Sequence, residues 1–151
     1  MKRVGILYHP MKEEAHSLAK KLEGFLGTKG CSVWLCSAWE WEKAREQVKG
    51  TDLVLSIGGD GTILRAAQAV LPGSTPITGI NLGKLGFMTE LNVDEVMDKL
   101  PALLAEEGHI DERALLEAEL YPTGEEQKPS QKFDALNDVV VARGAIARMI
   151  Y

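Results

Sequence analysis

Short apolar runs alternate with longer segments of helical periodicity over residues 1–110. The apolar runs are typical of buried strands and cover residues 4–8, 31–36, 53–57 and 77–81. Between them, apolar residues recur every three or four positions, which predicts helices over residues 15–26, 38–48, 63–70 and 93–107, the last kinked or split at Pro101. Such alternation through short connections indicates a parallel sheet covered by helices. We therefore expect residues 1–110 to form a Rossmann-like, doubly wound α/β domain.

The pattern changes after residue 110. Residues 113–121 alternate apolar and acidic positions, which favours a strand over a helix. Residues 122–132 are polar and should form a loop, whereas residues 136–141 and 145–151 are apolar or β-branched and should form strands. A few strands with one uncovered apolar face are marginally stable. We therefore interpret residues 111–151 as the first strands of a second, β-rich domain that is truncated, or that another chain completes.

The chain is organised around the turn that follows residues 53–57. Its sequence is Gly58-Gly59-Asp60-Gly61-Thr62, and a helical pattern begins directly after it. Glycines let the backbone approach a ligand closely, and a helix N-terminus behind a strand favours anions. We therefore predict a phosphate-binding turn formed by Gly58, Gly59 and Thr62, with Asp60 at the carboxyl end of a strand. The alternative that this stretch leaves open is a plain strand-to-helix turn in which Asp60 is only a cap.

A second glycine-containing loop, residues 82–90, follows the predicted strand over residues 77–81. It is not a Walker A loop, because Gly83-Lys84 is followed by Leu85 and the glycine spacing differs. The first turn lacks the third glycine of a Rossmann fingerprint, where Leu64 stands instead. The carboxyl ends of neighbouring parallel strands share one edge of a sheet. We therefore expect the two loops to face each other across one crevice.

Two tryptophans begin the predicted helix over residues 38–48. Ser37 should cap this helix, and Glu40 stands three residues later, as in a capping box. Trp39 and Trp41 are large for an exposed helix surface. We expect them to be buried against the sheet or a partner chain rather than to form a binding face.

Composition excludes several classes of partner. The 151 residues carry a net charge of −5 with a pI of about 5.2 and no basic patch, so we expect no nucleic acid. No apolar run approaches the ~20 residues that span a bilayer. The first residues have too few apolar positions for a signal peptide, so we expect them to form the first strand instead. Cys31 and Cys36 should point to opposite faces of a strand, and such free thiols fit the cytoplasm. The histidines His9, His16 and His109 are scattered, so we assign no metal ligands and interpret them as surface or loop residues.

Three motifs together closely resemble those of the bacterial NAD kinases. They are Gly58-Gly59-Asp60-Gly61-Thr62, the run Gly-Ile-Asn-Leu-Gly-Lys-Leu-Gly-Phe at residues 79–87, and Ala135-Leu136-Asn137-Asp138-Val139. The first motif is shared with diacylglycerol and sphingosine kinases and, loosely, with 6-phosphofructokinases. The other two are specific to NAD kinases, and the Pro-x-Gly-Thr-x-Asn-Asp type of loop of lipid kinases is absent. The resemblance covers essentially the whole chain.

The resemblance implies a fold and an activity. NAD kinases join a nucleotide-binding α/β domain of the NAD kinase, diacylglycerol kinase and phosphofructokinase type to a C-terminal β-sandwich. The resemblance implies that residues 1–110 form the nucleotide-binding domain, and we expect the β-sandwich to be incomplete here. They transfer a phosphoryl group from ATP, or from polyphosphate in some members, to the 2′-hydroxyl of the adenosine ribose of NAD, and the product is NADP. A divalent cation, Mg²⁺ first of all, is the expected cofactor. A homodimer or homotetramer is the expected assembly.

Two alternatives remain beside an NAD kinase. One is a lipid or sugar kinase of the same superfold, and the other is a catalytically incomplete nucleotide-binding fragment. The second arises because the family's later Thr-Pro-x-Gly-Ser-Thr-Ala-Tyr run, which supplies much of the NAD pocket, is not in this chain.

The resemblance also assigns site residues. Asp60 matches the aspartate that acts as general base, and Gly61 matches a neighbour that contacts NAD with it. An ordinary aspartate has a pKa near ~3.9 and is a weak base. Two roles therefore stay open for Asp60, either a base with a raised pKa or a group that orients the hydroxyl and helps to hold a metal ion.

Further matches concern the dinucleotide. Phe87 matches an aromatic residue beside the adenine. Asn137 and Asp138 match the pair that binds the adenosine part of NAD, in which the carboxylate holds a ribose hydroxyl. Arg65 and Arg148 match positions whose basic side chains often contact dinucleotide phosphate or ribose. The alternative for Asn137 and Asp138 is a pair of local backbone caps at a strand end.

Overall fold

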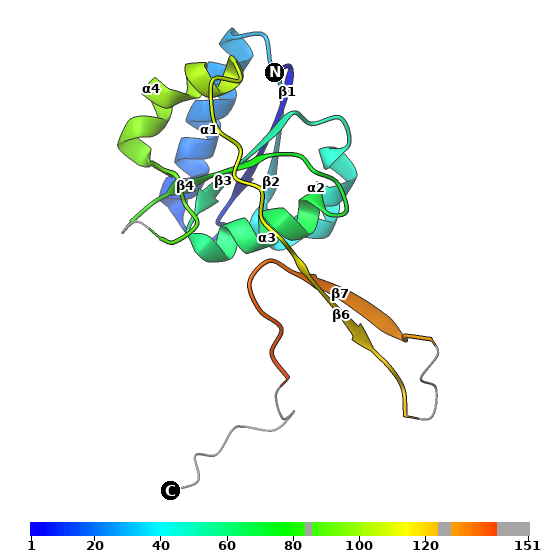
Figure 1. Ribbon diagram of the computed structural model, residues 1–151. Coiled ribbons are helices and arrows are strands. Elements are labelled where there is room, and N and C mark those ends of the chain that lie inside the picture. Colours follow the sequence, from blue (N-terminus) through cyan, green and yellow to red (C-terminus); the bar gives the residue numbers. More distant parts are fainter. Residues whose placement is uncertain (84–85, 124–127, 142–151) are drawn as a thin grey trace, which may run out of the picture. The chain divides into compact units, whose positions relative to one another are not determined.

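The computed structural model describes residues 1–83, 86–123 and 128–141. The chain divides into two compact units, Met1–Ile110 and Asp111–Tyr151. The first unit is an α/β layer structure and the second contains an antiparallel hairpin (Figure 1).

The α/β unit contains a five-stranded parallel sheet of order β2-β1-β3-β4-β5 (Figure 1). Its strands are β1 (Arg3–Tyr8), β2 (Ser32–Ser37), β3 (Leu53–Gly58), β4 (Ile77–Asn81) and the two-residue β5 (Leu91–Asn92). The first four agree with the apolar runs of the sequence. All six residues of β3 are buried, as expected for the central strand of a parallel sheet with both faces covered.

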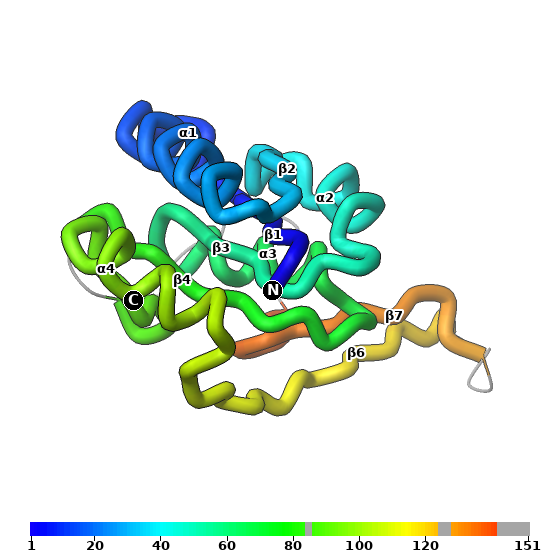
Figure 2. Tube along the Cα trace, turned by 90° about the horizontal axis from the view of Figure 1, so that it is seen from above, coloured from blue at the N-terminus to red at the C-terminus, as the bar shows by residue number. Residues whose placement is uncertain are grey.

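Four helices cover the sheet, two on each face: α1 (Glu13–Thr28), α2 (Trp41–Val48), α3 (Asp60–Val70) and α4 (Val93–Leu104). Helices α1 and α4 lie on one side and α2 and α3 on the other (Figures 1 and 2). Alternate strand residues feed the two separate cores, which confirms the doubly wound architecture. The first core joins α1 and α4 to the strands through Leu22, Leu100, Ile6, Leu55 and Ile80, and the second joins α2 and α3 through Val48, Ala66, Leu7, Trp34 and Val54.

Two predictions near α2 were wrong. Ser37 begins a 3₁₀ turn, Ala38–Glu40, by accepting a hydrogen bond on its Oγ from the Trp39 N–H at 3.2 Å. Helix α2 starts only at Trp41, and Glu40 makes no capping bond with its side chain. The extra tight turn takes Trp39 off the inner face of α2, so its side chain is 43% exposed and is not buried against the sheet. The burial of Trp39 against a partner chain stays a prediction. Trp41 is half-buried and packs against the second core.

Pro101 does not split α4 in two, although a kink or a split at this proline was predicted. The proline lies inside α4, three residues before the last helical residue. The final turn closes around it, because the Ala105 N–H donates to the Pro101 carbonyl at 3.1 Å. Buried Val96 and Leu100 hold the preceding turns against the sheet, so packing outweighs the lost backbone hydrogen bond.

The second unit contains β6 (Leu116–Leu120) and β7 (Gln131–Ala135), paired antiparallel. The prediction of β6 is confirmed. Strand β7, however, covers the last two residues of the predicted loop and residues 133–135, to which the sequence pattern assigned no element. Residues 136–141, which were expected to form that strand, contain none. The register explains the difference: residues Phe133 and Ala135 face Ala118 and Leu116, so they join the same apolar face. The strand expected over residues 145–151 lies outside the described residues.

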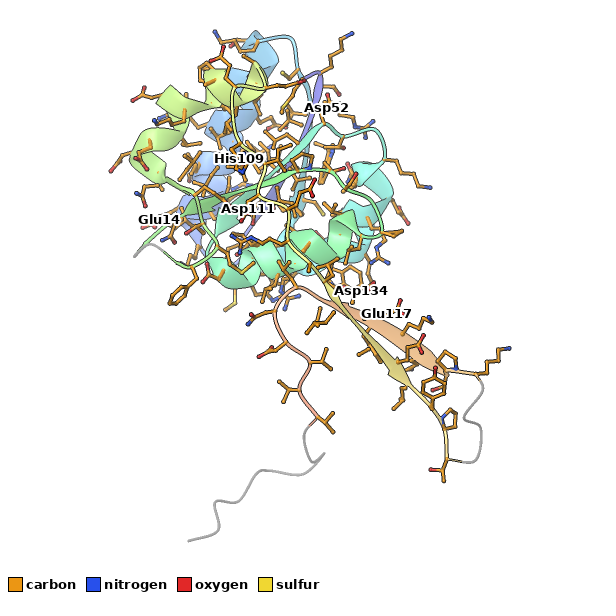
Figure 3. The ribbon with its side chains drawn as sticks, in the orientation of Figure 1. Glu14, Asp52, His109, Asp111, Glu117 and Asp134 are labelled. Atoms are coloured by element: carbon orange, nitrogen blue, oxygen red, sulfur yellow. The ribbon has the colours of Figure 1, made fainter. Side chains whose placement is uncertain are left out.

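The two faces of the hairpin differ in polarity. On one face, Lys132 forms ion pairs with Glu119 and, at 3.3 Å, with Glu117, and Glu117 lies opposite Asp134 in the register (Figure 3). The other face is apolar, yet Leu116 and Phe133 are 51% and 53% exposed. The hairpin therefore has one apolar and one charged face, but its apolar face is not buried as the apolar residues of the α/β sheet are.

Candidate functional site

The strand order makes the carboxyl ends of β1 and β3 a candidate ligand site. The chain runs from β1 outward to β2 and then returns to β3 on the other side of β1, so the winding direction reverses between β1 and β3. In open α/β sheets, ligands bind outside the carboxyl ends of the strands at such a reversal. Strand β1 ends at Tyr8, before His9, and β3 ends at Gly58, before Gly59 and Asp60.

The glycine turn after β3 is built around a buried threonine. A Cβ at Gly58 would overlap the Thr62 Oγ1, so only glycine fits there without rearrangement. The Gly59 N–H donates to the same Oγ1 at 3.4 Å, and Thr62 is 2% exposed. The hydroxyl of Thr62 thus shapes the turn from inside. No hydrogen-bond partner for the N–H groups of Asp60 and Gly61 occurs among the described residues.

The Asp60 carboxylate joins the glycine turn to the loop that follows β4. Its Oδ2 accepts a hydrogen bond from the Phe87 N–H and its Oδ1 one from the Met88 N–H, both at 3.1 Å. A Cβ at Gly86 would overlap Asp60 Oδ1, so this approach requires a glycine. The Gly86 N–H donates to Thr89 Oγ1 at 3.2 Å, which fixes the loop from its other end. The two glycine loops therefore meet, as the sequence predicted.

This arrangement leaves Asp60 fixed but not saturated. Each carboxylate oxygen can accept a second hydrogen bond beside the one from the loop. Open space lies beside Gly59 and Gly61, where an added Cβ would meet no atom within 4 Å. A hydroxyl that entered this space could donate its proton toward Asp60, while an anionic group faced the free N–H groups at the start of α3.

The loop side of the crevice offers an aromatic ring and an open groove. Phe87 is 98% exposed, so its ring is available for stacking on a planar group. An open groove of about 520 Å³ lies where β4 ends and α4 begins, and Asn81, Gly83 and Asn92 are among the residues that line it. The amide of Asn81 bonds with the backbone of Gly83, which shapes the start of the loop.

The β1 side carries a cluster that sequence reasoning missed. The His9 ring contacts the Trp39 ring with centroids 4.6 Å apart, and the Arg65 guanidinium lies over the same Trp39 ring at 4.4 Å. His9 was interpreted as an ordinary loop histidine. The available signal was its position directly after β1, next to the reversal of strand order, rather than any spacing to other histidines.

The remaining predicted site residues belong to the second unit. Asn137 and Asp138 follow the end of β7 closely, and both side chains are exposed. Their assignment to the adenosine of NAD stays a prediction. Arg148 lies outside the described residues.

No group of three or more His, Cys, Asp or Glu side chains that could hold a metal ion occurs in the described part of the chain. Within that part there is also no helix long and apolar enough to cross a membrane. Both cysteines are free, and burial, followed by the charge of Glu40, raises the pKa of Cys36.

Comparisons with known proteins identify the family. The family model of the ATP-NAD kinase N-terminal domain matches residues 4–108. An NAD kinase of Dehalococcoides mccartyi is 48% identical over 149 residues, which cover 99% of this chain and 52% of the relative. An NAD kinase of Chloroflexus aurantiacus is 35% identical over 150 residues, with 99% and 53% covered. The chain thus spans about half the length of these curated relatives.

A solved structure supports the fold. The crystal structure of yeast NADH kinase complexed with NADH matches with a TM-score of 0.71 and 18% sequence identity, over 91% of this chain and 47% of that chain. At this identity the likeness concerns the fold alone. The family match over residues 4–108 shows that the chain belongs to the ATP-NAD kinase family.

Proposed function

We propose that this chain forms the N-terminal part of an NAD kinase, which phosphorylates the 2′-hydroxyl of the adenosine ribose of NAD to give NADP. The observation that carries the proposal is the position of Asp60. Its carboxylate is held by two backbone N–H groups at 3.1 Å, directly beside the free N–H groups at the start of α3. A carboxylate next to an anion-binding helix end is what transfer of a phosphoryl group to a hydroxyl requires.

In this mechanism the ribose hydroxyl donates a hydrogen bond to Asp60 and is thereby aimed at the terminal phosphorus of the donor. The hydroxyl oxygen forms the new P–O bond, the bond between the terminal phosphoryl group and the rest of the donor breaks, and Asp60 accepts the proton. The N–H groups of Asp60 and Gly61 stabilise charge on the transferred group. Phosphoryl transfer depends chiefly on such positioning, so the two hydrogen bonds that fix the carboxylate contribute directly.

The dinucleotide would lie on the β4 side of Asp60. Phe87 offers an exposed ring for the adenine, and Gly61 allows close approach of the ribose. Asn137 and Asp138 would complete the adenosine site from the second unit, with the carboxylate on a ribose hydroxyl. The roles of these residues are those that the NAD kinase motifs imply, and this chain carries those motifs.

The cation and the surroundings of the enzyme follow from the same proposal. The described residues offer Asp60 but no ready-made cation site, so Mg²⁺ would be held mainly by the donor's phosphates with at most one protein carboxylate. The two free cysteines support a reducing compartment such as the cytoplasm, and the acidic pI argues against nucleic acid as a partner. We further propose that residues 111–151 open a C-terminal β domain and that the complete protein is a homodimer or homotetramer.

The test is a fusion of residues 1–151 to the C-terminal half of the Dehalococcoides mccartyi NAD kinase, whose N-terminal half this chain resembles at 48% identity. We expect the fusion to form NADP from NAD with ATP or polyphosphate, detected with an NADP-specific dehydrogenase. The variant Asp60→Asn should abolish turnover and leave NAD binding within about tenfold. A folded fusion that binds NAD but forms no NADP would overturn the proposal.

Two controls separate the competing functions. Diacylglycerol and fructose 6-phosphate replace NAD as acceptors, and phosphorylation of either in preference to NAD would indicate a lipid or sugar kinase. Residues 1–151 alone are assayed beside the fusion. Turnover by the fusion but not by the shorter chain would show that the shorter chain is a nucleotide-binding part that lacks the rest of the acceptor site.

A further inference from the structure

Three side chains from three different elements gather at the carboxyl edge of the sheet, beside the glycine turn. His9 follows β1, Trp39 lies in the 3₁₀ turn after β2, and Arg65 lies in the second turn of α3. The Trp39 ring is the common contact, with the His9 ring centroid at 4.6 Å and the Arg65 guanidinium at 4.4 Å. The cluster is half-exposed, so solvent or a ligand can reach it.

Arg65 is held in place without being neutralised. Among the residues that the structure describes, no carboxylate forms an ion pair with its guanidinium, and its ring partner carries no charge. Stacking on an aromatic face restricts the side chain while its N–H groups stay free to bind in the plane of the guanidinium. A restricted, unpaired guanidinium is a suitable partner for phosphate oxygens.

His9 presents a second donor. Its Nδ1 accepts a hydrogen bond from the Met11 N–H at 3.3 Å, so the neutral ring carries its proton on Nε2. The backbone of His9 is tied to β3, because its own N–H donates to the Ile57 carbonyl at 2.9 Å. The ring is therefore positioned by main-chain bonds on both sides, and Nε2 remains available to an anion.

The strand order separates this cluster from the loop that holds Asp60. Across the carboxyl edge the sequence of elements is Trp39 after β2, His9 after β1, Asp60 after β3 and the Gly86–Met88 backbone after β4. Asp60 thus has the cationic and aromatic cluster on one side and the loop with Phe87 on the other. In-line transfer needs donor and acceptor on opposite sides of the reacting phosphorus.

We propose that His9, Trp39 and Arg65 form the subsite for the phosphate chain of the phosphoryl donor, with Arg65 and His9 binding phosphate oxygens and Trp39 orienting Arg65. The inference rests on the proposed function and gives Arg65 a different partner from the dinucleotide that the family resemblance implied. The ligand chemistry is a chain of linked phosphates, which a nucleoside triphosphate and inorganic polyphosphate both supply.

The test measures binding of inorganic tripolyphosphate and of ATP to the 151-residue chain by isothermal titration calorimetry. Arg65→Gln should weaken tripolyphosphate binding about tenfold, since a charge-assisted hydrogen bond is lost. Trp39→Leu should weaken it about threefold, because Arg65 keeps its charge but loses its orientation. Comparable affinities for tripolyphosphate and ATP would identify the phosphate chain as the recognised group, whereas much tighter ATP binding that Arg65→Gln leaves unchanged would contradict the proposal.

Arg45 supplies the matched control. Its guanidinium lies over the Trp41 ring at 5.0 Å, the same kind of stack on the neighbouring element, and donates to the Gln68 carbonyl at 2.7 Å. Arg45→Gln therefore removes the same charge and the same type of contact outside the cluster of His9, Trp39 and Arg65. The affinity of the Arg45→Gln variant for tripolyphosphate should stay within about twofold of that of the unsubstituted chain. Equal weakening by Arg45→Gln and Arg65→Gln, or no binding of tripolyphosphate at all, would overturn the inference.

The fusion enzyme separates this inference from the proposed function. Arg65→Gln should raise the KM for the donor about tenfold and leave the KM for NAD within about twofold. NADP formation with an unchanged donor KM would reject the subsite while the kinase stands. Tripolyphosphate binding that depends on Arg65, without NADP formation, would reject the kinase while an anion site stands.

Discussion

The α/β unit and the hairpin use similar apolar residues with opposite results. In β3, Leu55 and Ile57 are fully buried, because α1 and α4 cover one face of the sheet and α2 and α3 the other. In the hairpin, Leu116 and Phe133 share an apolar face that is half exposed. An alternating pattern thus predicts a strand with one apolar face. That face becomes part of a hydrophobic core only where another layer of structure covers it.

The same difference separates the two groups of proposed site residues. Asp60 lies at the end of a closed core and is fixed by hydrogen bonds to the Phe87 and Met88 backbone. Asn137 and Asp138 follow a two-stranded hairpin and are exposed. The proposed catalytic carboxylate is therefore preorganised within the α/β unit, whereas the two residues proposed to bind the adenosine are not held by a closed core.

The largest expected effect comes from the same truncation in each unit. Leu55→Ala should destabilise the α/β unit by about 2–5 kcal/mol, because it leaves a cavity in the central strand. Leu116→Ala should change the free energy of unfolding by less than about 0.5 kcal/mol, because that side chain is already half exposed. Urea unfolding followed by circular dichroism measures both. A large loss in Leu116→Ala would show that the hairpin face is covered in solution.

The next effect tests whether the loop belongs to the rigid part of the site. Gly86→Ala should lower kcat of the fusion enzyme about 100-fold, because a Cβ there overlaps Asp60 Oδ1 and displaces the carboxylate. Gly27→Ala, on α1, is the control, since a Cβ at Gly27 meets no atom within 4 Å. Equal activity of the two variants would mean that the contact between the loop and Asp60 is not maintained during turnover.

A third pair of variants compares a tightly packed glycine position with an open one, both within the α/β unit. Gly5→Ala should destabilise the chain by about 1–3 kcal/mol, because its Cβ would overlap the buried Trp34 ring. Gly24→Ala lies on α1 with open space around it and should instead stabilise the chain by about 0.5–1 kcal/mol. Thermal unfolding distinguishes them, and shifts of the same sign would contradict the packing around β1.

The smallest expected effect concerns the amino edge of the sheet, opposite the carboxyl edge that holds Asp60. There, the N–H groups of Lys2, at 2.6 Å, and Arg3, at 2.9 Å, donate to Asp52 (Figure 3), and these bonds hold the pKa of Asp52 below its ordinary value. The folded state thus favours the charged carboxylate. Its contribution is present above the unfolded pKa of ~3.9 and is lost as the pH falls through the lower folded pKa.

Asp52→Asn should therefore reduce stability at pH 7, and the difference from the unsubstituted chain should shrink below about pH 4. Asp98→Asn, which removes a carboxylate at an exposed position of α4, is the control. Unfolding midpoints between pH 3 and pH 7 provide the measurement. A constant difference across this range would show that the charge of Asp52 is not what the backbone bonds recognise.

Particular residues show how far sequence reasoning reached. The runs that became β1 to β4, and the meeting of the two glycine loops, followed from local patterns, because burial on both faces leaves an unmistakable apolar run. The second strand of the hairpin was predicted at residues 136–141 because that run is rich in β-branched residues, which favour strands. The residues that pair with β6 are Gln131–Ala135 instead, because their apolar side chains match those of β6 in the register. Trp39 was misjudged because a 3₁₀ turn changed which side chains share the face of α2.

The sequence by itself determined the α/β class, the carboxylate at a strand end and the family, because periodicity and motif order are local properties. Only the tertiary structure decided which groups surround that carboxylate. The order β2-β1-β3-β4-β5 places the loop backbone on one side of Asp60 and the His9, Trp39 and Arg65 cluster on the other. Strand order depends on how helices pack across both faces of the sheet, and no short stretch of sequence contains that information.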